Sequence, residues 1–154
     1  MLREDFENGF GVFDKGGVHA RVYDSARGEV GVLRLQHGKG QNSAASTRPL
    51  SNNRSSSRNT RGAITWKVTF LYYGNGMEEY EDGFCVQYQE DNGQFKDAKC
   101  YESGKDFENG VWIEDEILIE ISDSTKTVRF RWMNEGNDRQ DDTLISWIQI
   151  DKQT

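Results

Sequence analysis

Proline, cysteine and histidine are scarce in this sequence, and long apolar runs are absent. Its 154 residues include one proline, two cysteines and two histidines. No apolar run approaches the length of a membrane-spanning helix, so we expect no membrane insertion. The charged start of the chain, Met1–Asp5, lacks the pattern of a secretory signal. No stretch of useful length has the 3.6-residue apolar period of a helix, which leaves β-structure as the expected architecture.

The scarcity of histidine argues against a catalytic site. A nucleophile activated by a base needs a positioned histidine, and neither His19 nor His37 lies in a recognisable motif. The sequence has no zinc-ligand spacing and no glycine-rich phosphate loop followed by a helix. Its 26 acidic residues offer carboxylate pairs for a glycosidase, but these fall in turns and on outer strand faces. We therefore predict that the protein is not an enzyme.

The charge of the chain excludes some partners. A formal net charge of −7 and a pI of about 4.9 predict no binding to nucleic acid. One polar segment, at about residues 37–62, has almost no large apolar side chains. Within it, Asn42–Leu50 favours an edge strand that Pro49 ends, and residues 51–62 favour a long flexible loop.

Apolar residues alternate with polar ones in many short runs, and this pattern predicts strands. The clearest is Ile64–Tyr73, where Ile64, Trp66, Val68, Phe70 and Tyr72 share the face that we expect to be buried. Turn residues separate the runs. The pattern predicts an all-β fold for residues 1–154 as one domain, an antiparallel β-sandwich of the jelly-roll type, either concanavalin-like or galactose-binding-like. The other predicted strands are a short one at the start of residues 3–15, His19–Asp24, Glu29–Gln36, Phe84–Gln89, Phe95–Tyr101, Glu114–Ser122, Thr127–Met133 and Leu144–Ile150.

The spacing of the two cysteines leaves two possibilities. If Asn92-Gly93 is a two-residue hairpin loop, Cys85 lies directly opposite Cys100, within reach of a disulfide. The same register, however, places Asp97 and Lys99 on the face that should be buried. A bulge between Phe95 and Cys100 would correct that face and shift the cysteines apart. The sequence therefore allows either a disulfide or two free thiols.

A second hairpin is predicted between the strands that end at Ser122 and begin at Thr127. It pairs Ile121 with Val128 and places Glu120 opposite Arg129 on the outer face. A cross-strand ion pair is therefore expected to hold this arginine.

Several short motifs occur in an order that resembles the MAM-like jelly-roll modules of extracellular proteins, which are related to many carbohydrate-binding modules. The resemblance implies a non-catalytic binding or adhesion module, located outside the cell or on its surface, with a carbohydrate or a protein as partner. It also implies one structural calcium ion near the start and end of the chain. The motifs are Asp5–Gly9, Gly16-Gly17, Leu33–Leu35, Thr65–Tyr73, Phe84–Val86, Gly104–Asn109, Val128–Arg131 and Asp141–Ile150.

The resemblance places the calcium ligands on the first and last strands. In the family pattern the closing strand contributes an aspartate, whereas this sequence has Ser146, a poor calcium ligand. Asp5, Glu7, Asp141 and Asp142 are the remaining candidates, since the first and last strands of a jelly roll are neighbours and calcium prefers hard oxygen ligands. The alternative is that these carboxylates are only solvated.

Aromatic residues supply the candidates for ligand binding. Tyr73, Tyr101, Trp112 and Trp147 are predicted to lie outward or at strand ends, and Arg131 to lie outward on its strand. Exposed rings beside polar side chains suit sugar binding, by stacking and by hydrogen bonds. The same rings would also cap the core or contact a neighbouring domain. The leading hypothesis is thus a carbohydrate-binding module, and the alternative is a protein adhesion or oligomerisation module without a sugar site.

Overall fold

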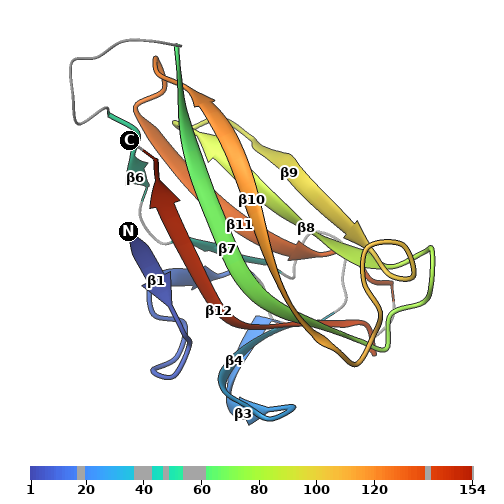
Figure 1. Cartoon of the computed structure of the whole chain (residues 1–154). Coiled ribbons are helices and arrows are strands. Elements are labelled where there is room, and N and C mark those ends of the chain that lie inside the picture. The colour runs from blue at the N-terminus through green and yellow to red at the C-terminus, as the bar shows by residue number, and fades with distance from the viewer. Residues whose placement is uncertain (17–19, 37–42, 47–48, 54–61, 138–139, 154) are drawn as a thin grey trace.

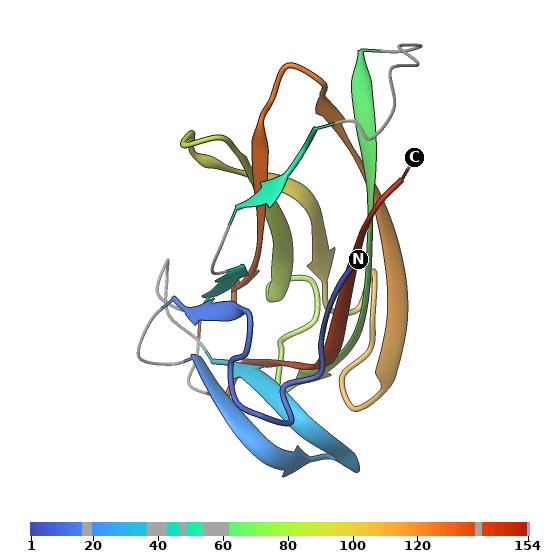
Figure 2. The same ribbon diagram turned by 90° about the vertical axis from the view of Figure 1, so that its left-hand side faces the viewer.

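The computed structural model is a sandwich of two antiparallel sheets (Figures 1 and 2). It describes residues 1–16, 20–36, 43–46, 49–53, 62–137 and 140–153, and within these ranges it contains no helix. None of the described residues forms a helix long and apolar enough to cross a membrane. The predicted all-β sandwich is confirmed. In chain order the strands are β1 (Leu2–Glu4), β2 (Phe13–Lys15), β3 (Ala20–Ala26), β4 (Glu29–Leu35), β5 (Ser43–Ser46), β6 (Leu50–Ser51), β7 (Ala63–Asn75), β8 (Gly83–Glu90), β9 (Phe95–Glu102), β10 (Trp112–Ser122), β11 (Thr127–Asn134) and β12 (Asp142–Lys152).

Each sheet is named here by its middle strand. The β12 sheet has the order β10-β7-β12-β4-β3, and β1 pairs with the far end of β12. The β11 sheet has the order β2-β5-β11-β8-β9, and β6 pairs with the start of β11. The two longest pairings, β10 with β7 and β12 with β7, make one continuous surface on the outside of the β12 sheet.

The core lies between the sheets and is rich in aromatic rings. Residues of β7 alternate between buried and half-buried along its whole length, which confirms the predicted inner face. Phe70 is at the centre, with the rings of Tyr72, Phe84 and Trp132 at centroid distances of 5.5, 6.2 and 5.6 Å. Burying each such side chain contributes about 1.5–3 kcal/mol, so this cluster holds the sheets together.

The predicted hairpin between the strands on either side of Asp123–Lys126 is wrong. β10 pairs with β7, and β11 pairs with β8, so this turn carries the chain from one sheet to the other. The inner faces of both strands are buried as expected, because strands in facing sheets bury the same alternate residues as two paired strands do. Consequently Glu120 is not opposite Arg129, whose guanidinium instead lies 3.6 Å from Asp14.

The polar segment also differs from its prediction. β5 is not an edge strand, since it pairs with β11 on one side and with β2 on the other. The start of the predicted flexible loop is anchored, because Asn52 is fully buried. Most of that loop, residues 54–61, lies outside the described residues, as do His19 and His37.

A disulfide joins Cys85 to Cys100 across the β8–β9 hairpin. The alternative, a bulge between Phe95 and Cys100, is also present, at the register shift between Val86 and Gln87. Near the turn Gln89 pairs with Phe95, so the loop is not the two-residue Asn92-Gly93 loop of the predicted hairpin. The bulge moves Asp97 to the outer face, opposite Gln87, without separating the cysteines. The disulfide and the bulge therefore coexist, although Lys99 stays on the inner side of β9, opposite Val86.

Candidate functional site

Three of the predicted ligand-binding residues lie on the outer face of the β12 sheet. Trp112 of β10 is the cross-strand partner of Tyr73 on β7. Trp147 of β12 is the partner of Leu71, two residues along β7 from Tyr73 and therefore about 7 Å away along the strand. The neighbours Tyr72 and Ile148 point into the core. We call Trp112, Tyr73 and Trp147 the aromatic face.

The β3–β4 turn fixes one end of the aromatic face. The rings of Tyr73 and Trp112 have centroids 5.2 Å apart and planes inclined by 52°. Arg27, in the left-handed conformation at that turn, accepts a hydrogen bond from the Trp112 indole on its backbone oxygen, at 2.9 Å. Its guanidinium lies over the Tyr73 ring and donates to Asn75. The turn thus holds both rings in place.

At the other end an arginine from the first strand covers Trp147. The guanidinium of Arg3 lies 4.9 Å from the centroid of the Trp147 ring and donates to Gln149 at 3.1 Å. Arg3 is exposed, and its long side chain can move aside. Polar donors therefore flank the rings at both ends.

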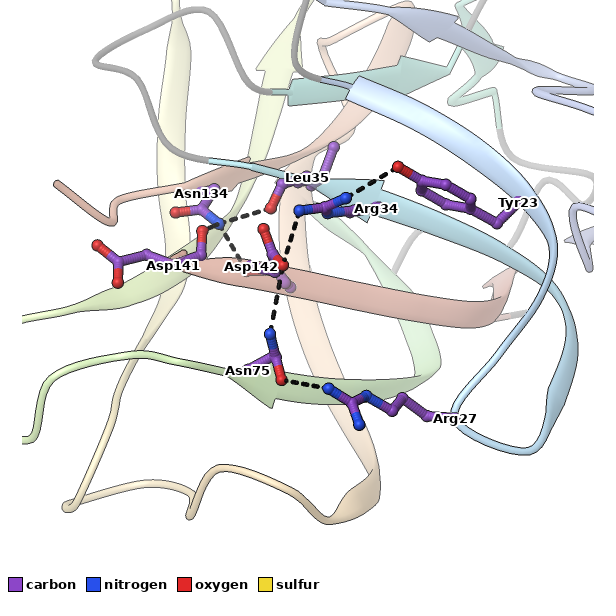
Figure 3. A network of polar contacts seen from close by, with 9 residues as sticks. Tyr23, Arg27, Arg34, Leu35, Asn75, Asn134, Asp141 and Asp142 are labelled. Carbon is purple, nitrogen blue, oxygen red and sulfur yellow. Dashed lines mark hydrogen bonds and ion pairs between the residues drawn. The ribbon is translucent and has the colours of Figure 1, made fainter. Parts of the chain in front are cut away.

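A polar network anchors β12 beside the aromatic face (Figure 3). Asp142 forms an ion pair with Arg34 at 3.1 Å and accepts a hydrogen bond from Asn75. Arg34 also donates to the Tyr23 hydroxyl at 2.8 Å. Burial raises the pKa of Asp142, although its interactions with Arg34 oppose that rise. Four strands, β3, β4, β7 and β12, are tied together by this network.

The four carboxylates proposed as calcium ligands are not brought together. The backbone of Asp5 and Glu7 lies against Gly31, near the start of β4. Asp142 lies beside the other end of β4, about 17 Å away along the strand. Asp141 is buried and accepts a hydrogen bond from the backbone of Asn137.

The chemistry around Asp142 also disfavours calcium. Its Oδ1 is buried and has no hydrogen-bond partner among the described residues, but its Oδ2 already faces the Arg34 guanidinium, which would repel a divalent cation. Among the described residues, the one group of three potential ligands within metal-binding distance is Cys85, Asp97 and Cys100, and both its sulfurs are in the disulfide. These residues do not fit the calcium site that the resemblance implied.

Tyr101 belongs to the core, which corrects the prediction that it lies outward. It is 4% exposed and stacks on Phe84, with centroids 4.6 Å apart. Burial and a hydrogen bond to Asp115 raise the pKa of its hydroxyl. The hairpin register already contained the signal, since it pairs Tyr101 with Phe84, a residue predicted to be buried.

Arg131 lies on the other sheet, away from the aromatic face. Its guanidinium is 4.0 Å from the centroid of the Phe95 ring, and its Nε donates to Gln87 at 2.8 Å. Gln87 in turn donates to Asp97 at 2.7 Å. Burial and the charge of Arg129 lower the pKa of Arg131. Sequence reasoning missed this polar ladder across β11, β8 and β9, because it depends on the bulge that turns Asp97 outward.

Several solved structures have a fold similar to that of this chain. The CBM22-1–GH10 modules of a Clostridium thermocellum xylanase, complexed with xylohexaose, match with a TM-score of 0.70 and 12% identity, over 99% of this chain and 28% of that one. The CBM22-1 xylan-binding domain of a Paenibacillus barcinonensis protein matches with 0.59 and 13%, over 98% and 92% of the two chains. The module TmCBM61, in complex with β-1,4-galactotriose, matches with 0.56 and 13%, over 97% and 99%.

The chain has the β-sandwich fold of carbohydrate-binding modules. No protein-family model matches the sequence, and a comparison with curated proteins finds no match. The carbohydrate-binding-module part of the expected resemblance is thus supported at the level of fold, while its MAM-like part stays a prediction. At these identities the likeness locates no binding residue, so the site must be argued from this chain's own side chains.

One pocket, of about 300 Å³, opens where β8 begins and β9 ends. Sequence reasoning did not foresee it, because its walls come from separate loops. The two disulfide-bonded cysteines, Phe84 and Tyr101 are among its lining residues, and most of the others are acidic.

Proposed function

We propose that this domain is a non-catalytic, extracellular carbohydrate-binding module that binds its ligand on the aromatic face. The observation that carries the proposal is that Trp112, Tyr73 and Trp147, distant in sequence, share one outer surface. Structures of similar fold are named for binding xylan or a β-1,4-galactan fragment, which supports a carbohydrate as ligand. The disulfide supports an oxidising compartment.

The chemistry of the face suits a sugar chain. A pyranose ring presents a flat array of C–H groups, which pack well against aromatic rings of large apolar area. Its hydroxyl groups need donors and acceptors at the ring edges, and Arg3, Arg27 and the exposed Glu114 lie beside the rings. Rings that are already held by Arg27 lose little freedom on binding, which favours affinity. Calcium has no part in this proposal.

Substitution of the aromatic face tests the proposal. Xylohexaose and β-1,4-galactotriose are suitable first probes, followed by a wider panel of glycans, with binding measured by isothermal titration calorimetry. W112A and W147A should each weaken binding about tenfold or more, which corresponds to about 1.4 kcal/mol. Y80A is the matched control, because Tyr80 is a 66% exposed ring outside the face. Binding that survives W112A and W147A but is lost in R131A would move the site to the polar ladder.

Protein adhesion or oligomerisation is the second candidate function. Leu118 and Val111 are 62% and 49% exposed at or beside β10, the edge strand of the β12 sheet. An exposed edge can pair with another chain. However, Glu114, Glu116 and Glu120 also lie on the outer face of β10, and their like charges would oppose pairing with a second copy. Concentration-dependent self-association in sedimentation, with no binding to any glycan, would favour this second function.

A further inference from the structure

The turn between β3 and β4 carries an arginine in a backbone conformation that arginine rarely adopts. Its two-residue loop, Arg27-Gly28, is closed by the pairing of Ala26 with Glu29. The φ angles of the loop residues are 53° and 87°. A type I′ hairpin turn requires such positive values, and asparagine, aspartate or glycine usually occupies its first position. An arginine there is strained and persists only where its surroundings hold it, which points to a functional role for its side chain.

Contacts to three residues hold Arg27 in this conformation. Its backbone oxygen accepts the hydrogen bond from the Trp112 indole at 2.9 Å, and its guanidinium lies 5.8 Å from the centroid of the Tyr73 ring. One guanidinium nitrogen, Nη2, donates to Asn75 Oδ1 at 3.0 Å. A guanidinium has five N–H groups, and among the described residues Asn75 is its one hydrogen-bond acceptor. The remaining N–H groups can therefore donate to a ligand beside the Tyr73 ring.

Asn75 links this arginine to the ion pair between β12 and β4 (Figure 3). Its amide nitrogen donates to Asp142 Oδ2 at 3.3 Å, and the same carboxylate oxygen lies 3.1 Å from Arg34. An ionised carboxylate only accepts hydrogen bonds, so the amide must turn its NH₂ group toward Asp142. The amide oxygen then faces Arg27. Asp142 thus fixes which side of the Asn75 side chain the arginine meets.

The place of Asn75 on β7 suits this role. It follows Tyr73 by two residues, so both side chains lie on the outer face of the sheet. Its backbone is paired with that of Asp142, independently of the side-chain contacts. Removing the amide therefore releases Arg27 but leaves the pairing of β7 with β12 in place.

We infer that Asn75 is a positioning residue of the aromatic face and acts through Arg27, whose remaining N–H groups recognise an oxygen of the glycan beside Tyr73. The inference rests on the proposed function and adds how the recognising arginine is held. A guanidinium that is fixed before binding loses little freedom when it donates to a sugar, which favours affinity. The strained turn thereby places a cationic donor at the edge of the aromatic rings.

Calorimetry with xylohexaose and β-1,4-galactotriose tests these roles. R27N should weaken binding about tenfold, although asparagine suits the turn better and the variant should unfold at the same or a higher urea concentration. N75A should weaken binding about fivefold, and the double variant N75A/R27N should bind no more weakly than R27N alone, because Asn75 acts through the arginine. R21A is the matched control, since Arg21 is an exposed arginine of the same hairpin, and it should leave binding unchanged.

NMR of the ligand-free protein supplies a second test that needs no sugar. In N75A the Trp112 indole N–H should exchange with water several-fold faster, because its acceptor, the backbone of Arg27, is no longer fixed. The Trp66 indole N–H, which donates to the buried Asn52, should keep its exchange rate and so report that the variant is folded.

Two results would overturn the inference. Unchanged exchange at Trp112 in N75A would show that Asn75 does not hold the turn. Losses of affinity in N75A and R27N that multiply in the double variant would show that the two residues act separately. If the wild-type protein binds neither probe, the result counts against the proposed function, and the exchange measurement still decides whether Asn75 positions Arg27.

Discussion

Lys99 of β9 and Asp115 of β10 form an ion pair, with 2.9 Å between Nζ and Oδ2, that joins an edge of one sheet to an edge of the other. The buried hydroxyl of Tyr101 donates a hydrogen bond to the same carboxylate oxygen. The β8–β9 bulge leaves Lys99 on the inner side of β9, opposite Val86, a face on which a charged side chain is not expected. The edge position of β9 lets this side chain reach the facing sheet instead of entering the core.

Asp115 should make the stability of the folded protein decrease as the pH falls. Burial opposes its ionisation, but the hydrogen bonds from Tyr101 and Lys99 outweigh burial and lower its pKa below the ordinary value of 3.8. A lowered folded-state pKa adds stability that is complete above the unfolded-state pKa and is lost as the pH falls through the folded-state value. D115N should therefore cost about 1 kcal/mol at neutral pH.

Urea unfolding of wild type and D115N, at neutral pH and at a pH of about 2, measures this difference. The two proteins should converge in acid, because the wild-type carboxylate is then protonated. E116Q is the control, since Glu116 is the exposed neighbour on the same strand. A constant difference between wild type and D115N across the pH range would contradict the assignment.

Replacing Asn52 should lower the stability of the fold more than replacing most other polar residues. It is fully buried, accepts a hydrogen bond from the Trp66 indole at 2.8 Å, and donates to the backbone oxygens of Ser122 and Thr125 at 2.9 Å each. N52A would leave these partners buried and unsatisfied, at a total cost of about 3 kcal/mol. N53A is the matched control, because Asn53 is exposed, and it should change stability by less than about 0.5 kcal/mol. Thermal or urea unfolding that gives similar values for both variants would refute this role.

The disulfide should stabilise the fold mainly by constraining the unfolded chain. Cys85 and Cys100 are 15 positions apart, and closing a loop of this length contributes about 3 kcal/mol. The C85A/C100A double variant should lower the urea midpoint accordingly. Wild-type protein unfolded in the presence of a reductant should show a similar loss, which separates the cross-link from side-chain packing. An unchanged midpoint in both experiments would mean that the bond adds no stability.

The sequence by itself determined the fold class, the approximate position of most strands and the buried face of the clearly alternating ones, such as Ile64–Tyr73. These follow from local rules, since a period of two places alternate residues on one face and turn residues interrupt the runs. It also identified Tyr73, Trp112 and Trp147 as outward-facing rings. The opposed cysteines were within its reach, but the choice between a disulfide and free thiols was not.

Only the tertiary structure decided which strands are neighbours. The buried pattern of Glu114–Ser122 and Thr127–Met133 is the same whether they pair in one hairpin or face each other across the core, and the chain takes the second course. For the same reason the sequence could not place Trp147 beside Tyr73, or separate Asp5 from Asp142. Long-range packing of two sheets sets these relationships, and alternation within one strand carries no information about them.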